Sequence, residues 1–120
     1  MRISEAATRS GLSIDTIRFY EKTGLLPHVE RGAEGYRRFS LETVDWLLLL
    51  ASLRETGMPM KKMRHFADLY RRGNDTIPER KRILLDHSLD LARRRAALDR
   101  CEEILAFKLK RYEEITGGLA

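Results

Sequence analysis

The sequence contains a single cysteine, Cys101, and this scarcity narrows the classes of protein it can encode. One cysteine excludes an internal disulfide framework and a zinc site built from several cysteines, and it is typical of a reducing compartment. We expect Cys101 to act as a small apolar group on a helix, with redox sensing as the less common alternative.

Long apolar runs are missing as well. The longest, Trp46 to Ala51, is far shorter than the roughly 20 residues that a membrane-spanning helix needs, so we expect no membrane span. The N-terminal residues M-R-I-S-E-A-A carry a charge without an apolar signal core, which predicts a cytoplasmic protein.

Neither the net charge nor the number of histidines is large enough to define a function by itself. Lys and Arg number 23 against 18 Asp and Glu, and the net charge of +5 suits a polyanion partner without requiring one. The three histidines, His28, His65 and His87, fall in separate predicted elements and have no nucleophile-base or metal-ligand spacing. In a chain of only 120 residues, we therefore expect no enzyme, no metal and no cofactor.

The most informative stretch is Ser13 to Lys22, S-I-D-T-I-R-F-Y-E-K. Ser13 is a favourable helix N-cap, and Ile14 with Ile17 forms only a narrow apolar stripe. The other side chains are expected to face outward, where their cation, hydroxyl and aromatic groups suit base edges and phosphates. They are Asp15, Thr16 and Phe19 opposite the stripe and Arg18 and Tyr20 on its borders.

The segments on either side of this stretch suggest a DNA-binding head. Before it, a short helix is expected from its cap Ser4 to Gly11, because glycine tolerates the left-handed conformation that ends a helix. Helix, glycine turn and capped second helix are typical of a helix-turn-helix, whose second helix enters the major groove. After it, we predict a β-ribbon from Val29 to Phe39 that lays Tyr36 and one arginine on the DNA backbone, with a solvated surface hairpin as the alternative.

Two further helices are predicted to build the core. One spans Leu41 to about Thr56 behind the cap Ser40, and the other runs from Pro59 to about Arg72. Lys61, in the first turn of the second, either binds a phosphate or is simply solvated. The expected core positions of the first helix are Val44, Leu47, Leu48 and Ala51.

From Thr76 onward the chain is predicted to form one helix that ends at Gly117 and Gly118. Thr76 and Glu79 have the spacing of a capping box at its start. Apolar residues recur every seven positions, as in a coiled-coil seam, which requires a partner subunit to be buried. The seam residues are Leu84, Leu91, Leu98, Leu105 and Tyr112. The sequence thus divides into a head, residues 1–75, and a dimerisation helix, residues 76–120.

At three places the chain resembles the MerR family of bacterial transcription regulators. The matching motifs are I-S-E-A-A-x-x-S-G-L-S-x-x-T-I-R-F-Y-E-K-x-G-L-L-P from Ile3 to Pro27, G-Y-R-R-F-S from Gly35 to Ser40, and L-R-E-T-G-M-P from Leu53 to Pro59. The resemblance implies a mainly α fold with a winged helix-turn-helix head, a helical pair and a long helix that dimerises as an antiparallel coiled coil. It also implies a homodimer that binds a palindromic promoter operator and distorts it for RNA polymerase.

The resemblance further implies roles for single residues. By position, Thr16, Arg18 and Tyr20 are similar to contacts with the groove or adjacent phosphates. Phe19 replaces a tyrosine of other members, which removes one hydroxyl. The backbone clamps implied in the same way are Tyr36, Arg37 and Lys61.

The effector and the partner are left open by the sequence. Metal-sensing members carry a cysteine where this chain has Thr76 and Ile77, and the chain is more similar to short members that respond to aldehydes or electrophiles. The reactive cysteine that several of those carry corresponds here to Ser52. The competing interpretation of the whole chain is a coiled-coil dimer whose head binds another protein rather than specific DNA.

Overall fold

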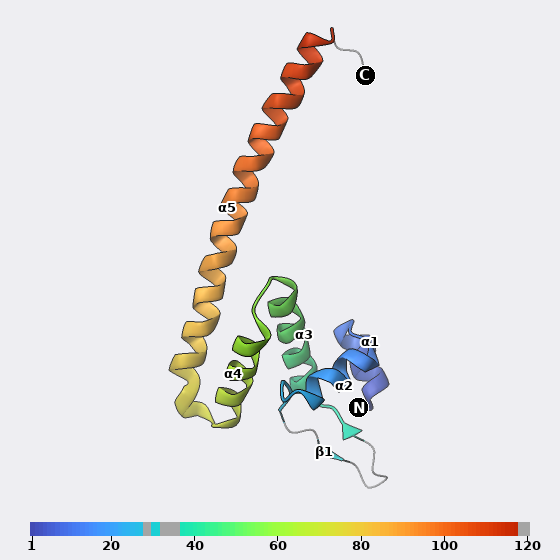
Figure 1. Cartoon of the computed structure of the whole chain (residues 1–120). Coiled ribbons are helices and arrows are strands. Elements are labelled where there is room, and N and C mark those ends of the chain that lie inside the picture. Colours follow the sequence, from blue (N-terminus) through green and yellow to red (C-terminus); the bar gives the residue numbers. More distant parts are fainter. Residues whose placement is uncertain (28–29, 32–36, 118–120) are drawn as a thin grey trace. The chain divides into compact units, whose positions relative to one another are not determined.

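The computed structural model of the chain describes residues 1–27, 30–31 and 37–117. The elements are mostly helical (Figure 1). In chain order they are α1 (Ile3–Ser10), α2 (Ile14–Lys22), β1 (Glu30–Arg31), β2 (Arg37–Arg38), α3 (Leu41–Glu55), α4 (Met60–Arg71), the 3₁₀ helix η1 (Asn74–Thr76) and α5 (Ile77–Ile115). The mainly α fold predicted from the sequence is confirmed.

The chain divides into two compact units, Met1–Ile83 and Leu84–Ala120. The sequence placed the division between residues 75 and 76, before the long helix. In the structure it falls inside α5, because Ile83 in the second turn of that helix is buried with the first unit.

The turn between α1 and α2 follows the sequence prediction. Gly11 ends α1 with a φ of 74°, and its N–H donates to the Ala7 carbonyl at 2.9 Å. Ser13 caps α2, since its Oγ accepts the Thr16 N–H at 3.0 Å. These two local bonds satisfy backbone groups that a helix end otherwise leaves without partners, and they fix where one helix stops and the next begins.

The predicted cap of α1 is wrong. The helix begins at Ile3, one residue before Ser4, and Arg2 occupies the N-cap position without a side-chain cap bond. Backbone bonds hold this end instead: the Phe39 N–H donates to the Met1 carbonyl, and the Met1 amino group donates to the Phe39 carbonyl, both at 2.7 Å. The start of the chain is thereby tied to the residue that follows β2.

The β-ribbon is confirmed as a pair of two-residue strands. β1 and β2 are antiparallel, with Glu30 opposite Arg38 and Arg31 opposite Arg37. Tyr36 and the turn between the strands lie outside the described residues.

The core of the first unit lies where α1, α2, α3 and α4 meet. α3 contributes more buried apolar residues to it than any other element. Ser40 caps this helix as predicted by accepting the Thr43 N–H at 3.0 Å. Leu48, which was expected in the core, is exposed, because at 100° per residue it falls on the same side of α3 as the exposed residues Asp45 and Ser52. The buried apolar residues of α3 are Val44, Trp46, Leu47, Leu50 and Leu53.

Trp46 joins three segments of the first unit. Its ring stacks on Phe66, with centroids 5.4 Å apart, and lies 4.6 Å from the ring of Tyr70. Its Nε1–H donates to the Leu25 carbonyl at 2.7 Å. Leu25 lies three residues after the end of α2, so this bond holds the segment that leaves α2 against α3 and α4. Trp46 is therefore a packing residue of the core.

The predicted capping box at the start of the long helix is wrong. Thr76 belongs to η1, and its hydroxyl lies 2.6 Å from the Leu69 carbonyl at the end of α4. Glu79 pairs with His65 at 3.1 Å. Both side chains bind α4 rather than the N–H groups of α5, a choice that local spacing cannot reveal.

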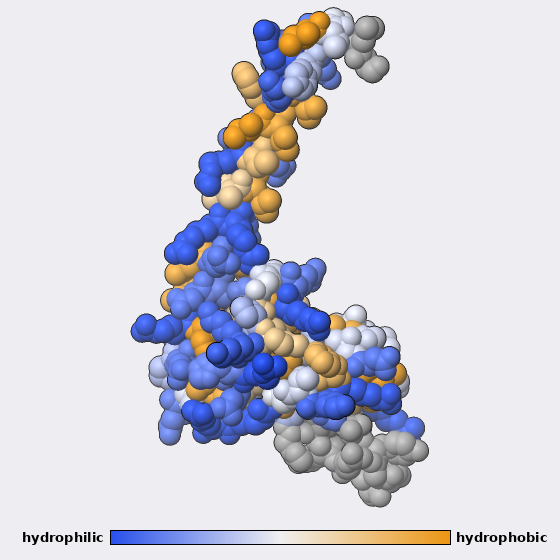
Figure 2. Space-filling view, viewed as in Figure 1, coloured by the Kyte–Doolittle hydropathy of each residue, from blue (hydrophilic) through white to orange (hydrophobic). Residues whose placement is uncertain are grey.

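The second unit is the remainder of α5. The whole helix has 39 residues, which corresponds to a length of about 58 Å. Large apolar side chains are exposed along it, and Figure 2 shows them as hydrophobic surface on the long helix. In this unit they are Leu85, Leu89, Leu98, Ile104, Leu105, Phe107, Leu109, Tyr112 and Ile115. Exposed apolar surface on this scale is typical of a protein–protein contact.

Candidate nucleic-acid interface

The exposed side of α2 is built from residues close to its N-cap. Ser13 Oγ donates to Thr16 Oγ1 at 2.8 Å while accepting the Thr16 N–H. The Thr16 hydroxyl therefore accepts one bond within the helix and keeps its own proton for an outside acceptor. A phosphate oxygen or a base-edge acceptor is a suitable partner for that proton.

Arg18 is the cation of this surface. Its side chain is exposed, and within the described part of the chain it forms no ion pair. A guanidinium without a carboxylate partner keeps all five N–H donors available, which is the arrangement that bidentate binding to guanine or phosphate requires.

The two aromatic residues of α2 have different environments. Phe19 is 43% exposed and lies on the outer surface, as predicted. Tyr20 is only 1% exposed, so its predicted outward position is wrong. Ring burial makes Tyr20 part of the core that supports α2, together with Ile17, and prevents the ring from facing a groove in this arrangement.

Arg54 is a candidate that the sequence did not single out. It lies in the last turn of α3, and its Cζ is 5.9 Å from the ring centroids of both Phe19 and Tyr20. The two distances are within the range of a cation–π contact. Arg54 thus adds a second exposed cation beside α2. Only its place in the L-R-E-T-G motif signalled it in the sequence.

Lys61 lies in the first turn of α4, where Lys62 is its neighbour and no acidic residue is present. Basic side chains at a helix N-terminus add to the partial positive charge of the helix dipole and favour an anion. Among the described residues, Lys61 forms no hydrogen bond or ion pair with α2, so the structure does not join it to Thr16 and Arg18.

In the β-ribbon, the structure describes the backbone pairing of the two strands. Arg37 is paired through β2 with Arg31, and the sequence-predicted clamp Tyr36 lies outside the described residues. The two clamp roles stay predictions.

A pocket of about 560 Å³ opens beside the N-terminus of α3 and is lined in part by Trp46 and Tyr70. Its wall also carries Glu42 and Asp45, whose carboxylates repel phosphate, so it does not belong to a DNA-binding surface. The Tyr70 hydroxyl donates to Glu42 at 2.9 Å. This bond, together with partial burial and the nearby carboxylate charge, raises the pKa of Tyr70 above its usual value of 10.0, since each favours the protonated phenol.

Two further features bear on other classes of site. The described residues include no group of three or more His, Cys, Asp and Glu side chains arranged to hold a metal ion, and Cys101 is an exposed free thiol. Within the same residues, no helix has both the length and the apolar character needed to cross a bilayer.

The chain matches two known protein families. Residues 1–69 match the family described as MerR HTH family regulatory protein, and residues 44–106 match the family described as MerR, DNA binding. An uncharacterized HTH-type transcriptional regulator of Haemophilus influenzae is 39% identical over 111 residues, which cover 92% of this chain and 82% of that protein.

Solved structures give the same result. The crystal structure of HiNmlR, a MerR family regulator lacking the sensor domain and bound to promoter DNA, superposes with a TM-score of 0.84 at 37% identity. The match covers 97% of this chain and 92% of that one. A putative MerR family transcriptional regulator from Listeria monocytogenes superposes with a TM-score of 0.85 at 32% identity, over 94% and 86% of the two chains.

Proposed function

Because the chain belongs to the MerR family of DNA-binding transcriptional regulators, we propose that two copies of it bind one palindromic promoter operator and distort it to control transcription. The relatives are transcriptional regulators rather than enzymes. The observation that carries the proposal is the similarity to HiNmlR over nearly the whole chain, since that regulator was solved on promoter DNA.

In this proposal, α2 is the recognition helix. Thr16 and Arg18 donate to base edges or adjacent phosphates, and Phe19 makes apolar contact with base edges, such as a thymine methyl group. The exposure of Arg18 and the free proton of Thr16 support these roles. Tyr20 acts from the core by fixing the position of the helix.

The backbone contacts come from outside α2. Tyr36 and Arg37 of the β-ribbon and Lys61 of α4 bind phosphates, and Arg54 joins them from the end of α3. Phosphate contacts fix the register of a protein on the duplex without reading its sequence. Their support is charge and exposure: Lys61 and Arg54 are exposed and lie in helix-end turns.

The second copy covers the apolar face of α5. The seam Leu84, Leu91, Leu98, Leu105 and Tyr112 pairs with the same residues of a second chain in an antiparallel coiled coil. The exposure of Leu98, Leu105 and Tyr112 in the single chain supports this pairing, because removing such apolar surface from water is favourable.

The symmetry of the dimer determines the orientation and the spacing of the two operator half-sites. Two-fold related heads require half-sites related by inversion, about 34 Å apart or a multiple of it. When a straight duplex does not match the separation of the heads, binding energy is used to bend or untwist it, and such a distortion changes how RNA polymerase meets the promoter. The partners are therefore promoter DNA, a second copy and, at the same promoter, RNA polymerase, all in the cytoplasm.

The proposal is tested by footprinting the DNA beside the gene and titrating the protected operator with the purified chain at several salt concentrations. The regulator is expected to protect an inverted repeat and to lose affinity steeply as salt rises, because phosphate contacts release counterions. Absence of DNA retention even at low salt contradicts the proposal and favours a protein-binding coiled-coil dimer.

Arg18→Ala is expected to weaken operator binding by about 1–3 kcal/mol, the typical cost of one base or phosphate contact. Band-shift titration measures the change. Arg93→Ala, which removes an exposed arginine from α5, is the control for the loss of one positive charge and should bind almost like the wild type. Equal affinities for the Arg18 variant and the wild type would exclude the proposed role of Arg18.

Lys61→Ala is expected to weaken binding to all sequences by a similar factor. The slope of log affinity against log salt should fall by about one, since one phosphate contact is lost. Fluorescence anisotropy on the operator and on a scrambled duplex measures both slopes. A change confined to the operator would show instead that Lys61 reads bases.

A further inference from the structure

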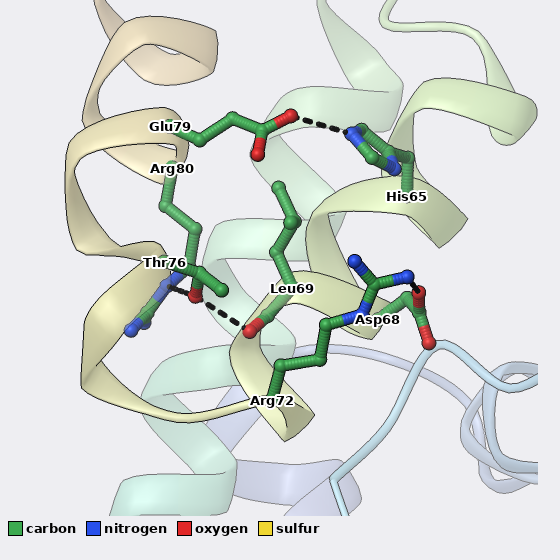
Figure 3. Close-up of polar contacts among 7 residues, drawn as sticks. All are labelled: His65, Asp68, Leu69, Arg72, Thr76, Glu79 and Arg80. Carbon is green, nitrogen blue, oxygen red and sulfur yellow. Dashed lines mark hydrogen bonds and ion pairs between the residues drawn. The ribbon is translucent and has the colours of Figure 1, made fainter.

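The junction between α4 and α5 is held by a network of side-chain bonds (Figure 3). At its centre is the Gly73 carbonyl, which accepts the Thr76 N–H at 3.2 Å and the Arg80 guanidinium at 3.2 Å. The Thr76 hydroxyl lies 2.8 Å from the same oxygen and 2.6 Å from the Leu69 carbonyl, and it can donate its one proton to either. Thr76 of η1 thus contacts one carbonyl in the last turn of α4, and Thr76 and Arg80 both bind the carbonyl of Gly73, just after that helix.

Arg80 completes this network from the first turn of α5. Its Nε donates to Thr76 Oγ1 at 3.0 Å, and its Cζ lies 5.2 Å from the centroid of the Tyr70 ring. The side chain is half-buried, so these contacts are less exposed to competing water than a surface ion pair. This one side chain of α5 therefore contacts both α4 and η1.

Glu79, the residue before Arg80 in α5, also contacts α4. Its carboxylate lies 3.1 Å from Nε2 of His65, and Figure 3 shows this pair apart from the Thr76 and Arg80 contacts. Successive helix residues point about 100° apart, so bonds from Glu79 and Arg80 together limit rotation of α5 about its own axis. The Glu79 pair is exposed and contributes little, which leaves Arg80 as the main constraint.

The Arg80 contacts continue toward the recognition helix. The Tyr70 ring under Arg80 packs against Trp46, and Trp46 donates to the carbonyl of Leu25, just after α2. In addition, the Arg71 guanidinium donates to the carbonyls of Gly24 and Leu26. The base of α5 and the end of α2 are thus connected within one compact unit by direct contacts.

We propose that Arg80, with Thr76, is a positioning residue that determines which half-site spacing the dimer accepts. The inference rests on the proposed two-headed operator binding. α5 is uninterrupted from Ile77 to Ile115, and the seam proposed for dimerisation lies along it. Loss of the contacts between the first turn of α5 and α4 should therefore change the position of each head on the duplex.

The test uses a set of operators whose half-site spacing varies in steps of one base pair, with affinity measured for the full-length protein on each. The wild type is expected to show a sharp optimum. Arg80→Ala should lower the ratio between the best spacing and its neighbours by about threefold or more, a typical effect for a residue that couples two elements. Thr76→Val, which replaces the hydroxyl by a methyl group of similar size, should act in the same direction.

Two variants separate positioning from a general loss of structure. Thr76→Ser retains the hydroxyl and should keep the wild-type spacing profile. Arg82→Ala removes an exposed arginine two residues further along α5, and its profile should also match the wild type. Circular dichroism and sedimentation confirm that each variant is folded and dimeric.

The outcomes distinguish this inference from the function on which it rests. If the wild type shows a sharp optimum and both Arg80→Ala and Thr76→Val weaken every operator by one common factor, the positioning role is overturned while the proposed function stands. If the wild type itself accepts all spacings equally, both are overturned.

Discussion

Leu98→Glu is expected to convert the protein into a monomer and to lower operator affinity by about 100-fold or more. Leu98 is 64% exposed in the single chain and lies in the middle of the proposed seam. A charged carboxylate is much more costly to bury in an apolar dimer contact than the leucine side chain that it replaces. Once the heads are separate, each half-site must bind alone, and the gain from linking two binding events is lost. Analytical ultracentrifugation measures the mass, and anisotropy measures the affinity.

Ala96→Glu is the matched control for the Leu98 variant. It adds the same carboxylate to the same helix at an exposed position that the seven-residue repeat places opposite the seam. This variant should remain a dimer and bind the operator with nearly wild-type affinity. A Leu98→Glu protein that stays dimeric would show that the seam is not the dimer contact.

Leu47→Ala is expected to reduce the free energy of unfolding by about 2–5 kcal/mol, the usual cost of removing a fully buried leucine side chain. Leu47 is 0% exposed and lies in α3, which packs against α1 and α4. Chemical denaturation followed by circular dichroism measures the change. Circular dichroism also detects the unfolding of α5, because α5 is helical too. Trp46 fluorescence reports on the core that contains Leu47, so it should follow the unfolding of the first unit.

The control for Leu47 lies in the same helix. Leu41 is 62% exposed, and Leu41→Ala should change the free energy of unfolding by no more than about 0.5 kcal/mol. Similar losses for the two variants would contradict the burial pattern of α3.

Sequence-based predictions succeeded where the cause of a structure is local. Ser13 and Ser40 cap the helices that follow them because a serine hydroxyl reaches an N–H only three residues away. Gly11 ends α1 because its positive φ is available to glycine without strain. The length of α5 could be predicted because its breakers, two adjacent glycines, are read directly from the sequence.

Predictions failed where a distant segment decides. Tyr20 stands between Phe19 and Glu21 in the sequence, and nothing in that order distinguishes the two aromatic rings. In the structure the ring of Tyr20 is buried in the core, whereas that of Phe19 is exposed. Thr76 has the spacing of a cap, but the Leu69 carbonyl of another helix is its partner. Arg54 is 34 residues beyond Tyr20, so no periodicity within α2 or α3 could reveal that it lies over that ring.

In the proposed function, two copies of the chain together bind one inverted repeat. The most direct measurement is selection of bound duplexes from a random DNA pool with the purified protein, followed by sequencing. The selected sequences are expected to converge on an inverted repeat with one fixed spacing between its halves. Convergence on a single unrepeated site, or no enrichment of any sequence, would contradict the proposed function.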